Sequence, residues 1–183
     1  MRICVFCGSN PGRSPLYADA ARVLGRLLAA EQIGLVYGGA NRGLMGILAD
    51  AILAAGGEVI GVIPEPVMAL EVAHGGLTDL RVVGSMHERK ALMAELSDAF
   101  VAMPGGIGTL DELFEIYTWR ALGIHAKPIA LWNVAGFFDP LLRMLDHTLA
   151  AGFMSGPTRE LLTFEGSARA LVDKLRSSAL TPS

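Results

Sequence analysis

The chain has 183 residues, of which 52% are hydrophobic and 18% are charged, a balance that excludes a disordered chain and supplies one domain with a sizeable core. Fifteen Lys and Arg residues against 18 Asp and Glu residues give a formal net charge of -3. This charge excludes an overall basic surface of the kind that binds nucleic acid or an anionic membrane. The apolar runs are shorter than the roughly 18 residues of a membrane span, and the first one is too short for a signal peptide, so we expect a soluble, cytoplasmic protein.

Cys4 and Cys7 are the two cysteines of the chain, and their C-x-x-C spacing is one that redox-active pairs use in cytoplasmic proteins. The residues around them are predicted to form a strand. Side chains an odd number of positions apart on a strand point to opposite faces of the sheet. We therefore predict two buried free thiols instead of a redox pair.

Short β-branched runs alternate with longer runs of helical periodicity along the whole chain. We expect strands at residues 2–7, 33–37, 58–63, 80–83, 99–103, 128–132 and 161–164, helices at 16–31, 44–55, 86–96, 110–122, 137–150 and 166–175, and an irregular segment or short helix at 67–76. Strands that are apolar throughout are typical of a parallel sheet with helices on both faces. We predict a single doubly wound α/β domain over residues 1–176 and a flexible tail over 177–183.

In a doubly wound sheet, ligands bind beyond the carboxyl ends of the strands. Three of the loops expected at this edge are rich in glycine, and they contain Gly8 and Ser9, Gly38 and Gly39, and Gly105 to Thr109. Each loop lies between a strand and a helix N-terminus, where free backbone N–H groups and the helix dipole favour phosphate. One such loop is compatible with a plain tight turn, whereas three together favour a phosphate site.

The common nucleotide fingerprints do not fit these loops. The first loop lacks G-x-G-x-x-G, which makes a dinucleotide site of the usual kind improbable. Gly38 and Gly43 have the Walker A spacing, but Leu44 occupies the position of the required lysine. The four histidines are scattered without metal-ligand spacing, so we predict no metal and no cofactor. A mononucleotide or sugar-phosphate site is the interpretation that is left.

Several charged residues lie near these loops, and each allows two interpretations. Thr109 and Glu112 have the T-x-x-E spacing of a helix capping box, while a carboxylate one turn beyond a phosphate loop is also suited to orient water or to stabilise positive charge. Arg89 and Lys90 fit either a solvated charged turn or an anion clamp. Glu71 taken alone is an ordinary surface acid.

Four spaced motifs carry a resemblance to a known family. Residues 104–112 match P-G-G-x-G-T-x-x-E in full, residues 86–90 match M-x-x-R-K, residues 37–46 match Y-G-G-x-x-x-G-L-M-G, and residues 7–9 fit the family's opening C-G-S. The likeness covers about residues 2–165 and continues through Thr118, Trp119 and residues 122–128. The sequence resembles the LOG ("lonely guy") family of cytokinin riboside 5'-monophosphate phosphoribohydrolases.

The resemblance implies a Rossmann-like homodimer that hydrolyses the N-glycosidic bond of a nucleoside 5'-monophosphate, such as AMP or a cytokinin riboside monophosphate. It implies that Arg89 and Glu112 are the catalytic pair. The substrate contacts that it implies are Glu71, Arg89, Lys90, Gly106, Ile107, Gly108, Thr109, Leu110, Asp111, Glu112 and Thr118. The chain departs from many relatives at Ala40, where a third glycine is common, and at Arg120 and Ala121.

Two other functions keep the same glycine loops. A nucleotide-binding carrier would use them without chemistry, and a broad nucleoside monophosphate nucleosidase would accept many bases. Family members are often labelled lysine decarboxylases. We find no support for that chemistry, because it normally needs a lysine that bears pyridoxal phosphate, and the three lysines are Lys90, beside the expected phosphate site, Lys127 and Lys174.

Overall fold

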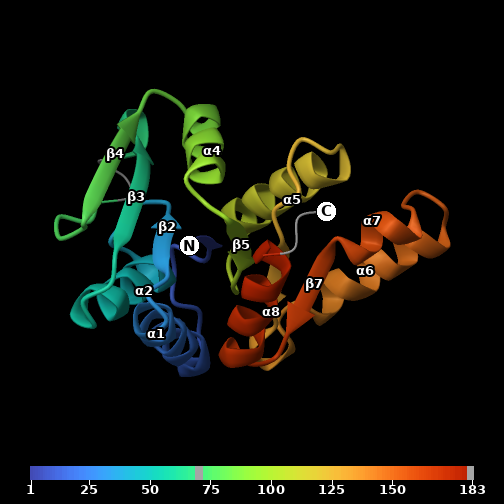
Figure 1. Cartoon of the computed structure of the whole chain (residues 1–183), viewed down its shortest axis with the longest axis horizontal. Coiled ribbons are helices and arrows are strands. Elements are labelled where there is room, and N and C mark those ends of the chain that lie inside the picture. The colour runs from blue at the N-terminus through green and yellow to red at the C-terminus, as the bar shows by residue number, and fades with distance from the viewer. Residues whose placement is uncertain (69–71, 181–183) are drawn as a thin grey trace.

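The computed structural model describes residues 1–68 and 72–180, which form a seven-stranded parallel sheet flanked by helices (Figure 1). The strand order is β4-β3-β2-β1-β5-β6-β7, and every neighbouring pair is parallel. The strands are β1 (Arg2–Phe6), β2 (Gly34–Tyr37), β3 (Val59–Pro64), β4 (Asp79–Val83), β5 (Ala99–Ala102), β6 (Ile129–Trp132) and β7 (Leu162–Glu165). The order reverses between β1 and β5, so the crevice at their carboxyl ends is the expected ligand site.

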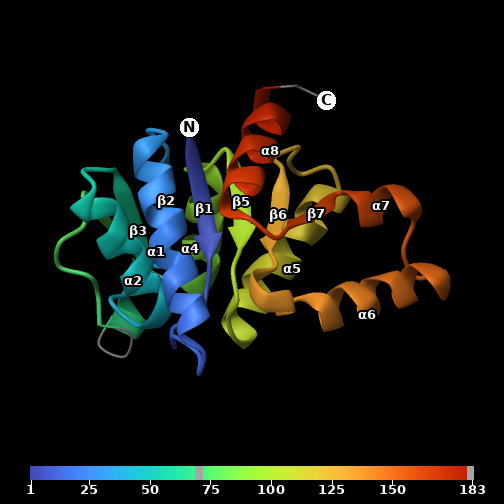
Figure 2. The ribbon, with the colours of Figure 1, turned by 90° about the horizontal axis from the view of Figure 1, so that it is seen from below.

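The helices cover both faces of the sheet, as predicted (Figures 1 and 2). On one face lie α1 (Pro15–Ala30), α2 (Gly43–Ala54) and α8 (Ala168–Leu180), and on the other lie α4 (Met86–Glu95), α5 (Ile107–Ala121) and α6 (Asp139–Ala150). The shorter elements are α7 (Gly156–Glu160) and the 3-10 turns η1 (Glu65–Val67) and η2 (Val134–Gly136). The doubly wound α/β architecture predicted from the sequence is confirmed.

Two apolar clusters form the core, one on each face of the sheet. Strands β2 and β5 are buried along their whole length, and β1 is buried after Arg2, because helices cover both faces of the sheet. Cys4 belongs to the cluster under α4 and α5, and Cys7 belongs to the cluster under α1 and α2. Both are buried free cysteines on opposite faces, so the prediction against a redox pair is confirmed.

The structure contains a helix, α7, that the sequence analysis did not predict. Ser155 caps this helix by accepting a hydrogen bond from the backbone N–H of Thr158 at 3.2 Å. Contacts from α5 hold the segment in place, because the Tyr117 hydroxyl donates to the Thr158 carbonyl at 2.8 Å and Arg120 donates to the Leu161 carbonyl at 2.9 Å. Arg120, one of the departures from many relatives, therefore anchors the chain between α7 and β7.

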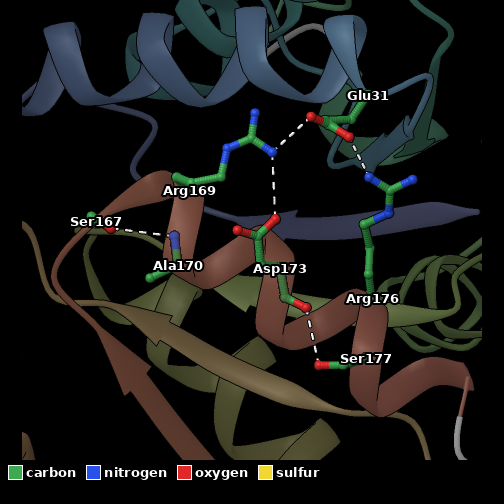
Figure 3. Close-up of polar contacts among 7 residues, drawn as sticks. All are labelled: Glu31, Ser167, Arg169, Ala170, Asp173, Arg176 and Ser177. Atoms are coloured by element: carbon green, nitrogen blue, oxygen red, sulfur yellow. Dashed lines mark hydrogen bonds and ion pairs between the residues drawn. The ribbon is translucent and has the colours of Figure 1, made fainter.

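The C-terminal helix is longer than the sequence predicts, because α8 runs to Leu180 and includes four residues that we assigned to a flexible tail. Figure 3 shows polar contacts along this helix. Glu31, at the C-cap of α1, forms ion pairs with Arg169 and Arg176, and the Ser177 hydroxyl donates to the carbonyl of Asp173 at 3.0 Å. The ion pairs of Glu31 join residues that are far apart in the sequence, so local sequence patterns do not reveal them.

A candidate active site at the carboxyl ends of the strands

A cavity of about 330 Å³ opens where the strand order reverses. Its wall combines residues that are far apart in the sequence but follow neighbouring strands. It is formed by Ser9 and Asn10 after β1, Gly38 after β2, Arg89 of α4, and residues 106–109 together with Asp111 and Glu112 at the start of α5. The cavity thus unites residues from all four motifs that the sequence analysis singled out.

Backbone hydrogen bonds fix the loops around the cavity. The N–H of Gly8 donates to the Pro104 carbonyl at 3.1 Å, and the N–H of Leu44 donates to the Gly8 carbonyl at 2.9 Å. Gly105 has to be glycine, because a Cβ there would lie 2.1 Å from the Thr109 hydroxyl oxygen and 2.9 Å from the Gly8 nitrogen. Gly8 and Gly105 therefore set the spacing of the loops. They line a neighbouring cavity of about 210 Å³ instead of this one.

Helix α5 begins closer to the glycine loop than expected. Its N-cap is Gly106, which provides no side chain to cap the first turn, and Ile107, Gly108 and Thr109 already belong to the helix. The capping-box interpretation of Thr109 and Glu112 is therefore wrong, because Thr109 lies inside the helix and is buried. The N–H groups of the first turn lie at the cavity wall, in the arrangement that favours an anion.

Arg89 is the buried cation of the site. Its side chain is 4% exposed, and Nη2 donates to the carbonyl oxygen of Gly38 at 3.1 Å. A Cβ at Gly38 would lie 1.9 Å from the same Nη2, which explains why glycine stands there. The interpretation of Arg89 as part of a solvated charged turn is therefore wrong, whereas an anion clamp fits its position.

The helix that carries Arg89 starts with a capping box of its own. The Ser85 hydroxyl accepts from the N–H of Glu88 at 3.2 Å, and the Glu88 carboxylate accepts from the N–H of Gly84 at 2.9 Å. This S-x-x-E spacing is present in the sequence and is a signal that our sequence analysis missed. The box fixes the start of α4 and with it the direction in which Arg89 projects.

Glu112 lies on the same cavity wall as Arg89. Cys7 also lines this cavity, and the Glu112 charge acts on its thiol. Burial raises the pKa of Cys7 well above its usual range, and the nearby Glu112 carboxylate raises this pKa further. The site therefore holds an acid and a buried cation beside the free amides of a helix.

Other predicted site residues lie outside this cavity wall. Lys90 forms ion pairs with Asp111 and Glu115 and does not line the cavity. Gly39 lies in the second glycine loop with a positive φ of 76°. On α5, Leu110 is partly buried and Thr118 is exposed. Glu71 falls outside the described residues. Met45 and Met86 line the cavity and were not predicted as site residues, since a Met carries no distinctive sequence signal. Asn10 of the first glycine loop lines it as well.

The described residues contain no cluster of three or more His, Cys, Asp or Glu side chains placed to hold a metal ion. None of the helices in the described ranges is long and apolar enough to cross a membrane.

The sequence is similar to known proteins over most of its length. Residues 45–175 match the family model described as "Possible lysine decarboxylase". A probable cytokinin riboside 5'-monophosphate phosphoribohydrolase of Oryza sativa subsp. japonica, LOGL9, is 52% identical over 95% of this chain and 77% of its own length. The cytokinin riboside 5'-monophosphate phosphoribohydrolase of Rhodococcoides fascians is 52% identical over 86% of the chain and 80% of its own length. The chain belongs to the LOG family.

Solved structures with the same fold come from proteins that are more distant in sequence. The molybdenum cofactor binding protein of Rippkaea orientalis superposes with a TM-score of 0.73 at 23% identity, covering 96% of this chain and 95% of its own. A molybdenum cofactor carrier protein of Chlamydomonas reinhardtii gives a TM-score of 0.73 at 21% identity, covering 97% of this chain and 96% of its own. These likenesses confirm a Rossmann-like fold and show nothing further.

Proposed function

We propose that this LOG family member hydrolyses the N-glycosidic bond of nucleoside 5'-monophosphates and releases the free base and ribose 5-phosphate. Cytokinin riboside 5'-monophosphates, which the names of its relatives specify, and purine nucleotides such as AMP are the proposed substrates. The observation that carries the proposal is that Arg89 and Glu112, which lie on different helices, line one cavity beside a glycine-rich helix N-terminus.

The phosphate group fits the N-terminus of α5. The amides of the first turn, from Ile107 to Thr109, lack a side-chain cap and lie at the cavity wall. The helix dipole and these N–H groups together favour a dianion. The proposed site is completed by the loops that contain Ser9 and Gly38, with Gly8, Gly39 and Gly105 setting their shape.

Glu112 is suited to the chemistry at the ribose. Cleavage of the C1'–N bond passes through a state with oxocarbenium character, and the bonding electron pair leaves with the base. A carboxylate facing C1' stabilises the positive charge and accepts a proton from the water that bonds to C1'. The base gains one proton as it leaves, so hydrolysis consumes one water molecule and releases the free base.

Arg89 has a different role, because a guanidinium stays protonated and cannot act as a general acid. Its buried charge beside the cavity is suited to hold phosphate or ribose oxygens in a fixed orientation. We assign it to substrate binding and to the orientation of the nucleotide relative to Glu112.

A carrier protein that binds a nucleotide without chemistry is the second candidate. An acid beside an anion site favours catalysis over a carrier, since pure phosphate binding does not need it. The test is incubation with a panel of nucleoside 5'-monophosphates followed by chromatography of free bases. Release of base supports hydrolysis, release from every nucleotide indicates a broad nucleosidase, and tight binding without release indicates a carrier.

Lysine decarboxylation has no support in the geometry. Lys90 is paired with Asp111 and Glu115, Lys127 donates to the Ala94 carbonyl at 2.7 Å, and Lys174 pairs with Glu165 at 2.8 Å. None of these three lysines lines the cavity. A lysine that forms a Schiff base needs a free amine at the reaction site.

We also propose that the protein is cytoplasmic and that it forms a homodimer through α5. One stripe of this helix is exposed and begins at the cavity rim with Ile107 and Asp111. It continues through Phe114 and Thr118 to Leu122, which is 70% exposed. A second copy seated on this stripe covers its apolar side chains and brings Thr118 close to the partner's cavity, which accounts for the substrate contact that the resemblance implies for Thr118.

Light scattering of two variants tests the dimer. Leu122→Asp is expected to yield a monomer, because it places a charge in the proposed interface. Phe153→Asp is the matched control, since Phe153 is 88% exposed but lies between α6 and α7. A Leu122→Asp protein that keeps the mass of the wild type contradicts the assignment of this stripe.

A further inference from the structure

Residues 72–76, which follow β3 and precede β4, are held against the second glycine loop by two backbone hydrogen bonds. The N–H of Asn41 donates to the carbonyl of Val72 at 2.9 Å, and the N–H of His74 donates to the carbonyl of Gly39 at 2.9 Å. The segment therefore lies along the loop as a strap, and residues 72–76 are called the strap below.

The backbone of the strap is strained where it meets the loop. Val72 has a φ of 52°, a conformation that a β-branched residue rarely adopts. Strain of this kind persists where the surrounding contacts outweigh its cost. The next residue, Ala73, forms an isolated antiparallel bridge with Ala40 of the loop. The position of the strap is thus set by its neighbours and not by its own backbone preferences.

His74 is the side chain that fixes the strap. It is 6% exposed, and both of its ring nitrogens have a partner. Nδ1 accepts a hydrogen bond from the N–H of Gly76 at 3.1 Å, and Nε2 lies 2.9 Å from Oδ1 of Asp50 on α2. Because Nδ1 is an acceptor, the ring proton is on Nε2, which donates to the Asp50 carboxylate. The ring therefore ties the strap to the helix that follows the glycine loop.

The loop that the strap holds is also the loop that contacts Arg89. The carbonyl of Gly38 accepts from Nη2 of Arg89 at 3.1 Å, and the carbonyl of the next residue, Gly39, accepts from the N–H of His74. Gly38 and Arg89 both line the candidate active-site cavity. A movement of the strap is therefore passed to the guanidinium through two consecutive peptide groups.

We infer that His74 is a positioning residue for the proposed nucleotide site. Its side chain fixes the strap to Asp50, the strap fixes the second glycine loop, and the loop fixes the carbonyl that holds Arg89. It acts on the nucleotide through Arg89, since its own ring nitrogens are occupied by Gly76 and Asp50. The inference rests on the proposed function for the identity of the ligand.

The experiment measures amide hydrogen exchange of the ligand-free protein and calorimetric binding of ribose 5-phosphate. His74→Ala is expected to speed exchange in the strap and in residues 38–41, because the strap loses its side-chain contacts. It is expected to raise Kd for ribose 5-phosphate by about tenfold or more, since a shift of about 1 Å in a site has effects of this order. Unchanged exchange in residues 38–41 overturns the inference.

Two variants of Asp50 test the same contact from its other side. The side chain of Asp50 is 65% exposed, so its replacement leaves the core intact. Asp50→Ala is expected to raise Kd by about fivefold, the effect of one lost hydrogen bond. Asp50→Asn is expected to stay within about twofold of the wild type, because an amide oxygen still accepts from Nε2. If His74→Ala does not fold, Asp50→Ala decides, and a Kd equal to that of the wild type overturns the inference.

Asn133→Ala is the matched control for a loss of stability. The Asn133 side chain ties the end of β6 to the start of α6, because it donates to Oδ1 of Asp139 at 2.6 Å and accepts from the N–H of Phe138 at 2.7 Å. It does not line the cavity. The control is expected to lower Tm and to leave Kd unchanged. A purely structural role predicts the same pattern for His74→Ala, and that pattern overturns the inference.

Kinetics with AMP give a further distinction. KM is expected to rise in His74→Ala while kcat stays within about threefold, because Arg89 is assigned to binding. A fall in kcat at unchanged KM contradicts this path through Arg89. A wild-type protein that binds ribose 5-phosphate but releases no base refutes the hydrolase and leaves the exchange and binding results for His74 intact.

Discussion

The charged side chains at the carboxyl ends of the strands are arranged differently from those at the amino ends. At the carboxyl ends Arg89 is 4% exposed and lines a cavity of about 330 Å³. At the amino ends Arg2 and Glu58 form an ion pair in which both side chains are 41% exposed. A larger cavity, of about 800 Å³, lies at this second edge. Volume alone therefore does not identify the site, whereas a buried cation and an acid beside free helix amides do.

Glu112→Gln gives the largest effect expected from this comparison. A positioned carboxylate contributes about 10²–10⁴-fold as an acid–base catalyst, and kcat for base release from AMP is expected to fall by that factor while Tm stays unchanged. Glu58→Gln at the opposite edge is the control and is expected to leave kcat unaltered. Equal turnover of Glu112→Gln and wild type would remove Glu112 from the mechanism.

Gly38→Ala tests the fit between the second glycine loop and the buried cation. The new methyl group would lie 1.9 Å from Nη2 of Arg89, so the guanidinium has to move. We expect KM for AMP to rise by about tenfold or more, since a shift of about 1 Å has effects of this order. Gly166→Ala is the matched control, because no atom lies within 4 Å of a Cβ there. An unchanged KM in Gly38→Ala would show that Arg89 does not depend on this fit.

The thiols of Cys4 and Cys7 provide a test that depends on pH. Burial raises the pKa of both, so the thiolate fraction in the folded protein is negligible at pH 8, where an ordinary cysteine is partly ionised. Iodoacetamide is expected to label neither thiol in the native protein at pH 8 and both in guanidinium chloride, as read by mass spectrometry. Rapid labelling of native Cys7 would contradict its burial.

Arg2→Ala is expected to have the smallest effect. Exposed ion pairs contribute about 0–1 kcal/mol, and base release should be unaffected. Arg2 lowers the pKa of Glu58 by its hydrogen bond and its charge. The contribution of the pair is therefore present above the ordinary pKa of a glutamate and is lost as the pH falls through the lowered value. Urea unfolding is expected to show a larger difference between Arg2→Ala and wild type at pH 7 than at pH 3.

Most of the fold was predictable from the sequence because its signals are local. Runs that are apolar throughout mark the strands of a parallel sheet, and the odd spacing of Cys4 and Cys7 placed them correctly on opposite faces. The errors arose where long-range contacts decide the structure. Glu31 holds the last turns of α8, and Tyr117 holds α7, and neither contact leaves a local pattern.

The site was predictable in part. The glycine loops and the motif that contains Glu112 indicated a phosphate site, and the structure places them around one cavity. The T-x-x-E spacing was misleading, because the helix begins at Ile107 and Thr109 is too far inside it to act as a cap. The partners of Lys90 on α5 were not predictable, since the packing of α4 against α5 decides them.

A crystal structure of Glu112→Gln with AMP tests the central claim most directly, because this variant is expected to bind the nucleotide without cleaving it. The account predicts the phosphate at the amides of Ile107 to Thr109, Arg89 within hydrogen-bond reach of phosphate or ribose oxygens, and residue 112 facing C1'. AMP bound elsewhere, or bound with C1' turned away from residue 112, would contradict it.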